Sequence, residues 1–146
     1  MAIVIRPLAP DDYNAWANLW RGYLNFYQTS VHDDVYETSF ARMLSSDHPS
    51  LNGLVAVSDR HLVGLVHFIF HPHNWRLEDV CYLQDLYVDP AYRGGGIGRS
   101  LISAVYAAAD ANKTPSVYWL TQDFNQTARR LYDTIATVTP FIKYNR

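Results

Sequence analysis

The 146-residue sequence has a single cysteine, Cys81, so an internal disulfide cannot form. Because Cys81 lies in an apolar run, we interpret it as a core residue of a protein from a reducing compartment. Basic side chains are also few, since 12 Lys and Arg stand against 14 Asp and Glu, with a formal net charge of −2. No basic stripe is present, and the composition therefore argues against a nucleic-acid partner.

Long apolar runs are missing as well. No stretch approaches the roughly 20 residues that cross a bilayer, and residues 1–7 lack the basic and apolar regions of a signal peptide. We therefore expect a cytoplasmic protein without a membrane partner. The six histidines are scattered, and only His71 and His73 are close together. Since no third ligand stands at a recognised spacing, we expect a loop there and no metal site.

Apolar and aromatic residues are abundant, at 49% and 14% of the chain. This content is sufficient for one sizeable core at this length. No internal repeat, low-complexity tract or linker divides the sequence, so we expect a single domain over residues 1–146.

Hydrophobic periodicity predicts a mixed α/β (α+β) fold with helices on both faces of the sheet. The order is β-α-α-β-β-β-α-β-α-β, in which the three consecutive strands form an antiparallel meander. The predicted strands are 3–8, 51–57, 61–70, 80–88, 116–120 and 140–144, and the predicted helices are 10–27, 38–44, 97–108 and 128–135, with a turn at 30–34.

Glycines cluster between the third meander strand and the next helix, in Arg93-Gly94-Gly95-Gly96-Ile97-Gly98. They permit a tight turn and leave the backbone open to a ligand. Unpaired amides and the dipole of the following helix favour an anion such as a pyrophosphate. Arg99 and Leu101 exclude a Walker A loop and a dinucleotide fingerprint. A glycine-rich turn without a ligand is the alternative.

The segment 86–98 resembles the coenzyme A-binding signature of the GNAT N-acetyltransferase superfamily. The core of that signature, Arg/Gln-x-x-Gly-x-Gly/Ala, is matched by Arg93, Gly96 and Gly98. Residues 82–146 resemble more closely the fungal histone and polyamine acetyltransferase-like branch. The resemblance implies a GNAT fold, acetyl-CoA as co-substrate, direct transfer to an amine, and a homodimer.

A second motif, Asn-x-x-Ala-x-x-Leu-Tyr, is matched from Asn125 to Tyr132. Positions 125, 128 and 132 are three and four residues apart and share one side of a helix. The resemblance implies that Tyr132 is the general acid that protonates the leaving thiolate. A tyrosine that only packs in the core is the alternative. The implied coenzyme A contacts are Leu86, Tyr87, Val88, Arg93, Gly94, Gly95, Gly96, Ile97, Gly98, Arg99, Asn125, Ala128 and Tyr132.

The general base is less clearly indicated. Polyamine acetyltransferases of the superfamily have Leu-Glu-Asp on the third meander strand, whereas this chain has Leu83-Gln84-Asp85. Gln84 cannot act as a base. Neighbouring residues face opposite sides of a strand, so Asp85 faces the amine only if a bulge changes the parity. A structural role for Asp85 and deprotonation through a water chain are the alternatives.

Acidic and aromatic residues follow the first helix and suit a cationic amine. Asp33, Asp34 and Tyr36, together with Gln84, are therefore candidate substrate contacts, although a solvated acidic turn explains the acids equally well. The branch resemblance suggests a small amine, a polyamine or a lysine-type acceptor. A non-catalytic acyl-CoA-binding sensor is the alternative function.

Overall fold

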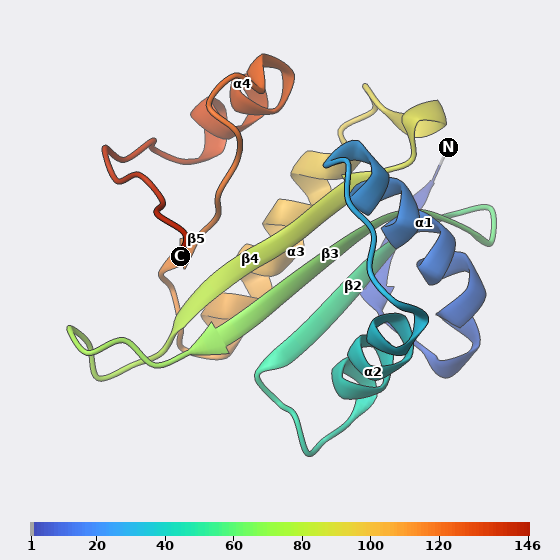
Figure 1. The fold of residues 1–146 in the computed structure, drawn as a ribbon, viewed down its shortest axis with the longest axis horizontal. Helices are drawn as coiled ribbons and strands as arrows, with labels where there is room; N and C mark the ends of the chain where they lie inside the picture. Colours follow the sequence, from blue (N-terminus) through green and yellow to red (C-terminus); the bar gives the residue numbers. More distant parts are fainter. Residues whose placement is uncertain (1) are drawn as a thin grey trace.

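The computed structural model describes residues 2–146, which form a five-stranded sheet with helices on both faces (Figure 1). The strands are β1 (Ile3–Pro7), β2 (Leu51–Ser58), β3 (His61–His71), β4 (Val80–Val88) and β5 (Val117–Tyr118). The helices are α1 (Tyr13–Phe26), α2 (Asp33–Leu44), α3 (Ile97–Ala111) and α4 (Gln126–Ile135), with 3-10 turns at Pro10–Asp12 and Pro90–Tyr92.

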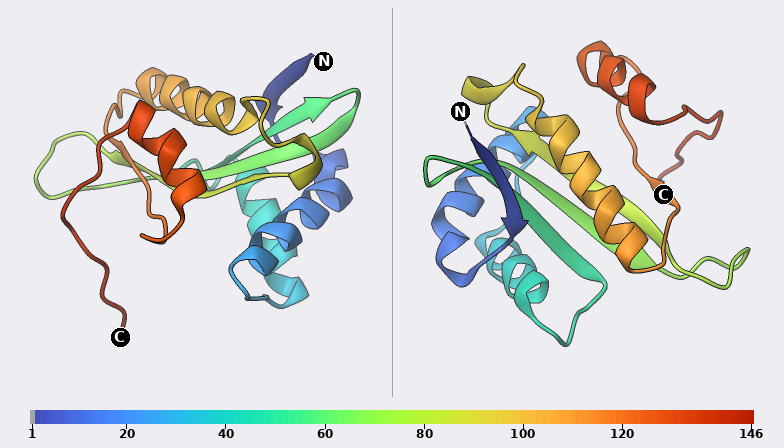
Figure 2. Two further views of the ribbon diagram at one scale, coloured as in Figure 1. Left: turned by 90° about the horizontal axis from the view of Figure 1, so that it is seen from above. Right: turned by 180° about the vertical axis from the view of Figure 1, so that it is seen from behind.

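The strands lie in chain order across the sheet. β1 to β4 are antiparallel, and β5 joins β4 in parallel. The predicted α/β (α+β) fold and its antiparallel meander are therefore confirmed. Figure 2 shows α1 and α2 on one face of the sheet and α3 on the other. We call these the α1 face and the α3 face.

Each face of the sheet has its own hydrophobic core. On the α3 face, Val66 and Phe68 of β3 pack with Leu101 and Val105 of α3. On the α1 face, the aromatic side chains of α1 and α2 pack over Val55 and Leu65. The two layers arise because successive residues of β3 point to opposite faces while both faces are covered.

Helix α1 lies unusually close to β4 at one point. A methyl group at Gly22 would lie 2.6 Å from the hydroxyl oxygen of Tyr87, so only glycine fits there without a shift. The start of the helix is held by Asp12, which accepts bonds of 2.7 and 2.9 Å from the guanidinium of Arg6. That hydrogen bonding lowers the pKa of Asp12 despite its burial. The approach of α1 to β4 places aromatic side chains over the centre of the sheet.

Three of the predicted elements differ from the structure. Helix α2 begins at Asp33 rather than residue 38, because His32 caps it by accepting a bond of 3.2 Å from the Asp34 amide. The predicted buried strand 116–120 is reduced to Val117–Tyr118, and Leu120 beyond it is 52% exposed. Its parallel partner β4 diverges after two residue pairs, so the ladder cannot continue.

The final strand predicted at 140–144 is wrong. Within the described residues, no backbone hydrogen bond joins this segment to the sheet, and Figure 2 shows it extending away. Phe141, Ile142 and Tyr144 are 84%, 75% and 87% exposed. The alternating apolar pattern was compatible with a strand, but a strand also requires an edge with which to pair.

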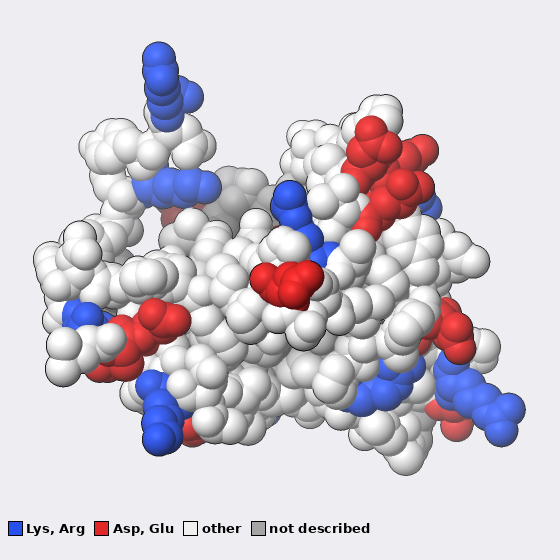
Figure 3. Space-filling view, turned by 90° about the horizontal axis from the view of Figure 1, so that it is seen from below, with Lys and Arg blue, Asp and Glu red and all other residues white. Residues whose placement is uncertain are grey.

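The surface carries no concentrated field of one sign on the face drawn in Figure 3, where acidic and basic side chains form small, separate groups on a largely uncharged surface. Among residues 2–146, no helix has both the length and the apolar character that a bilayer crossing requires.

Candidate functional site

The glycine loop connects the end of β4 to the start of α3. Gly94 and Gly96 have φ of +87° and +84°, a left-handed conformation that other residues rarely adopt. A methyl group at either position would meet nothing within 4 Å, so the backbone faces open space. Gly96 is the N-cap of α3, and no side chain caps the helix there. The amides of the first turn are therefore available to an anion.

Arg93 lies beside this loop in a fixed position. Its Nε donates a 2.8 Å hydrogen bond to the Val88 carbonyl, and its guanidinium carbon lies 5.2 Å from the ring centroid of Tyr87. Arg99, in contrast, extends from α3 to α4 and donates a 2.8 Å bond to Thr134 Oγ1. Ile97 is buried in the core of the α3 face. The loop thus contributes one cation that is held against the end of β4.

Strands β4 and β5 separate beside the loop. They pair only at Cys81 with Val117 and at Tyr82 with Tyr118, so residues 83–88 of β4 have no strand on that edge. Leu86 and Tyr87 lie on this unpaired edge. The two parallel strands therefore diverge after two residue pairs. The carbonyls of Gln84 and Val88 accept side-chain bonds from Tyr23 and Arg93, and the backbone between these two residues is left for an extended ligand arm.

Helix α4 carries the second motif. Asn125 is its N-cap, and its Oδ1 accepts a 3.3 Å bond from the Ala128 amide. Tyr132 is half-buried against Trp119, with ring centroids 5.4 Å apart. Burial, followed by the neighbouring Tyr27, raises the pKa of Tyr132 to about 12. Its phenol is therefore protonated at neutral pH.

A β-bulge in β4 determines which way Asp85 points. His67 of β3 pairs with Asp85, whereas the next residue, Phe68, pairs with Leu83. Gln84 is thus the extra residue, and its side chain is exposed. Leu83 belongs to the α3-face core, but Asp85, two residues later, bonds to side chains of the α1 face. The bulge supplies the change of parity that this orientation requires.

Asp85 is held in a buried hydrogen-bond network. Its Oδ2 lies 2.7 Å from His67 Nδ1 and accepts a 3.2 Å bond from Trp20 Nε1. Trp16 Nε1 in turn donates a 2.9 Å bond to His67 Nε2. Asp85 is only 8% exposed, so these partners compensate for much of the cost of burying its charge.

Tyrosines surround the Asp85 carboxylate. The pKa of Tyr23, Tyr27 and Tyr82 is raised, in each case first by burial and also by the negative charge of Asp85. Tyr27 also contributes to the raised pKa of Tyr132. Tyr27 therefore links the two candidate catalytic groups, which lie in one electrostatic neighbourhood although they are 47 positions apart in sequence.

The other substrate candidates lie elsewhere. Asp33 and Asp34 are exposed in the first turn of α2, where carboxylates suit the positive end of the helix. Tyr36 is 6% exposed and packs edge-on against Trp20 with ring centroids 5.0 Å apart. Cys81 is fully buried, and burial raises the pKa of its thiol to about 11. That environment suits a core residue and not a nucleophile.

Sequence reasoning missed His67, Trp16 and Trp20. A signal was present, because His67 is the one polar side chain within the run Leu62 to Phe70. The two tryptophans stand four residues apart and so share one side of α1. The histidine in an apolar strand and the paired tryptophans on one helix face together predict a hydrogen bond between the strand and the helix.

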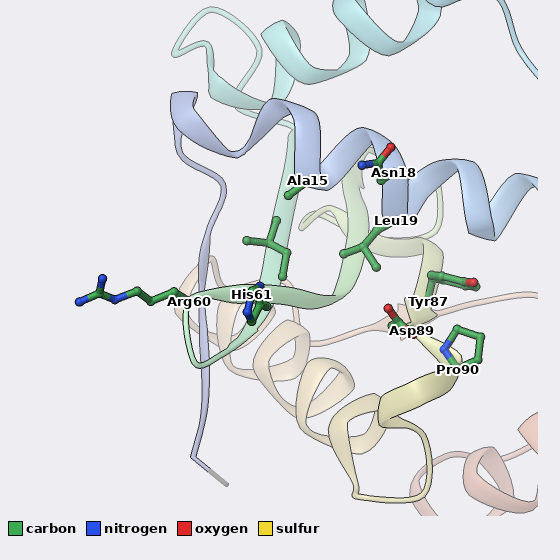
Figure 4. A pocket seen from close by; sticks show the side chains of 9 residues that line it. Ala15, Asn18, Leu19, Arg60, His61, Tyr87, Asp89 and Pro90 are labelled. Atoms are coloured by element: carbon green, nitrogen blue, oxygen red, sulfur yellow. The ribbon is translucent and has the colours of Figure 1, made fainter.

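A hollow of about 330 Å³ lies on the α1 face, between α1, the β2–β3 turn and the end of β4 (Figure 4). Its lining includes Arg60, His61 and Asp89 but neither the loop glycines nor Asp85 nor Tyr132. Among residues 2–146, no group of three or more His, Cys, Asp or Glu side chains is arranged to hold a metal ion. The candidate site is thus the gap beside β4.

Comparisons with known proteins identify the family of the chain. The Acetyltransferase (GNAT) family model matches residues 13–135, so the chain belongs to the GNAT acetyltransferase family. The chain is 36% identical over 145 residues to the D-amino-acid N-acetyltransferase HPA3 of Saccharomyces cerevisiae, covering 99% of this chain and 90% of that protein.

Solved structures show the same fold. A ribosomal-protein-alanine N-acetyltransferase from Brucella melitensis superimposes with a TM-score of 0.79 at 24% identity, covering 99% and 98% of the two chains. AAC(6')-Iy in complex with a coenzyme A bisubstrate analogue gives a TM-score of 0.87 at 17% identity, covering 100% and 98%. The protein is an acetyl-CoA-dependent N-acetyltransferase of the GNAT type, and acetyl-CoA is its co-substrate.

Proposed function

We propose that this enzyme transfers the acetyl group directly to a primary amine, with Tyr132 as the general acid and Asp85 as the carboxylate that receives the amine. One observation carries the proposal. The ring of Tyr27 lies 5.1 Å from that of Tyr23, whose hydroxyl bonds the Gln84 carbonyl of β4 next to Asp85. Asp85 contributes to the raised pKa of Tyr27, and Tyr27 contributes to that of Tyr132, so both candidate groups act on the same aromatic side chain. An acid and a base on either side of one reacting centre are what acyl transfer to an ammonium requires.

The proposed roles follow from the charge of each group. Acetyl-CoA supplies the activated acetyl group as a thioester. Asp85 attracts the ammonium and takes its proton, directly or through water, so that the nitrogen lone pair can attack. As the new C–N bond forms and the C–S bond breaks, Tyr132 donates its proton to the leaving sulfur. Its raised pKa keeps that proton in place beforehand.

The coenzyme A contacts are proposed from the same geometry. The first turn of α3 suits the pyrophosphate because its amides are uncapped, and Arg93, which begins the same loop, supplies a cation held at the end of β4. The unpaired edge of β4, with Leu86, Tyr87 and Val88, suits the amide-bearing pantetheine arm. One backbone amide of this edge is proposed to polarise the thioester carbonyl.

The glycines and α4 complete the proposed coenzyme A site. Gly94, Gly95 and Gly96 keep the approach to the backbone open, whereas Gly98 lies close to Leu131 of α4. Asn125 and Ala128 form the start of α4 that borders the arm, and Asn125 also caps that helix.

The acceptor class is proposed from the relative with the named activity. HPA3 is called a D-amino-acid N-acetyltransferase, and its similarity covers nearly all of this chain. This favours a small D-amino acid as the acceptor. Its origin in yeast also supports the fungal branch, in which polyamines and lysine side chains are the other amines to test.

Free-thiol release from acetyl-CoA tests the proposal. Purified protein is assayed with D-amino acids, their L enantiomers, polyamines and a lysine peptide, with no-amine reactions as controls. Amine-dependent thiol release and an acetyl mass increment on that amine are expected. Tight coenzyme A binding without release from any amine would contradict the proposal and support an acyl-CoA-binding sensor.

We also propose that residues 1–146 act as one catalytic domain in a cytoplasmic homodimer. Val138, Phe141 and Ile142 are 69%, 84% and 75% exposed beyond α4, which is unusual unless another surface covers them. Sedimentation of the chain should give a dimer, and Phe141→Ser with Ile142→Ser should shift it toward the monomer. A monomeric wild-type protein at micromolar concentration would contradict this proposal.

A further inference from the structure

Three buried side chains from three elements form a hydrogen-bonded chain on the α1 face. Trp16 Nε1 lies 2.9 Å from His67 Nε2, and His67 Nδ1 lies 2.7 Å from Asp85 Oδ2. Trp16 is fully buried, while His67 and Asp85 are 7% and 8% exposed. Bulk water cannot readily replace these partners, so the order of donors and acceptors is set by the side chains themselves.

The identity of Trp16 determines the tautomer of His67. An indole N–H can only donate a hydrogen bond, so His67 Nε2 must offer its lone pair. The proton of a neutral imidazole is then on Nδ1, from which it is donated to Asp85. A proton on Nε2 would place two donors face to face at 2.9 Å. The neutral Nδ1–H tautomer is the form that satisfies both bonds.

The same network leaves one carboxylate oxygen available. His67 and Trp20 both bond to Oδ2 of Asp85. The side-chain bonds from His67 and Trp20 do not involve Oδ1, and the nearby Tyr23 hydroxyl, whose pKa is raised partly by hydrogen bonding to Asp85, is the other polar group at this carboxylate. Oδ1 is thus the oxygen that His67 and Trp20 leave available to an ammonium group.

We infer that His67 is a positioning residue for Asp85 and that Trp16 fixes the tautomer in which it acts. The inference rests on the proposed function, since it concerns the carboxylate that receives the amine. In its Nδ1–H form, His67 holds Oδ2 and thereby orients Oδ1 toward the amine. Trp20 supports the same oxygen through a longer bond of 3.2 Å.

A double-mutant cycle tests whether His67 acts through Asp85. His67→Leu removes the donor at similar bulk and is expected to lower kcat/KM for the amine about 10-fold to 100-fold, the effect of losing a hydrogen bond to a charged group. The KM for acetyl-CoA should stay unchanged. His67→Asn keeps an N–H donor and should recover most of the loss. His61→Asn, at the exposed start of β3, is the matched control and should behave as wild type.

The second arm of the cycle uses an Asp85→Asn background. There His67→Leu should cause no further loss, because the carboxylate on which it acts is gone. Additive losses in the double variant, or His67→Asn as impaired as His67→Leu, would overturn the inference. Coenzyme A binding by each variant confirms that it is folded.

The tautomer of His67 can be measured directly, without any assay of enzyme activity. Long-range ¹H–¹⁵N NMR of wild-type protein at pH 7 should show His67 protonated at Nδ1 alone, and Trp16→Phe should reduce the population of that form. An Nε2–H tautomer in the wild type would overturn the inference whatever the kinetics show. If no amine is acetylated, the proposed function fails, and with it the catalytic purpose of His67, even where NMR finds the Nδ1–H form.

Discussion

The two sides of the candidate site are built very differently. On the proposed amine side, Asp85 is anchored in the core by His67 and Trp20, below a layer of aromatic side chains. On the thiol side, Tyr132 belongs to α4, a helix in which no residue is buried. Two hydrogen bonds connect α3 to α4. Arg99 donates a 2.8 Å bond to Thr134 Oγ1, and the Tyr106 hydroxyl donates a 3.0 Å bond to the Ile135 carbonyl.

The difference shows where precision is required. An ammonium and its carboxylate must meet in one geometry, and a rigid sheet provides it. The leaving sulfur belongs to a long co-substrate, which we propose enters along the β4 edge, and a lightly packed helix can adjust to it.

The largest expected effect is the loss of the proton donor on the thiol side. Tyr132→Phe keeps the packing against Trp119 and removes only the hydroxyl. We expect kcat to fall about 100-fold to 1000-fold, within the range for general acid–base groups, with coenzyme A affinity unchanged. Steady-state kinetics with calorimetric coenzyme A titration measure both, and Tyr144→Phe in the exposed C-terminal segment is the control. A kcat within twofold of wild type would exclude Tyr132 as the general acid.

The contrast in packing predicts a difference in stability. Leu101 is fully buried in the α3-face core, whereas Leu120, between β5 and α4, is 52% exposed. Leu101→Ala should lower the free energy of unfolding by about 3 kcal/mol, because it leaves a cavity. Leu120→Ala should change it by less than about 0.5 kcal/mol. Urea denaturation of both variants measures the difference, and equal losses would show that the region before α4 is packed as tightly as the core.

Alkaline pH should act on the thiol side through Tyr132. Its pKa is about 12 in the folded chain against an ordinary 10.0, so the native state retains the proton in that interval and the unfolded state does not. This contribution to stability is complete below pH 10 and is lost as the pH rises toward 12. Between these values, wild-type unfolding free energy should fall by about 1 to 2 kcal/mol more than that of Tyr132→Phe. Parallel pH dependences for the two proteins would contradict the assigned environment.

The sequence was informative where the pattern is local. Glycine spacing and the Asn125 motif predicted the loop, α3 and α4 because each signal lies within one element. The orientation of Asp85 could not be predicted, since it depends on the bulge at Gln84 and on the register in which β4 pairs with β3 at His67. The segment 140–144 has a strand-like pattern, but its conformation depends on whether a sheet edge is available. Long-range pairing is therefore what single-sequence reasoning lacked.

The smallest expected effect concerns Asp33 and Asp34, which lie outside both sides of the site. They are exposed at the start of α2, so they can attract a cationic amine only through solvent, where ionic screening limits the effect. Asp33→Ala with Asp34→Ala should raise the KM of a cationic amine about twofold to threefold at low salt, leave kcat unchanged, and have no effect near 0.5 M salt. Asp47→Ala with Asp110→Ala removes the same charge from distant exposed positions and serves as the control. A rise of more than tenfold that persists at high salt would mean that these carboxylates contact the amine directly, and recognition would then extend well beyond Asp85.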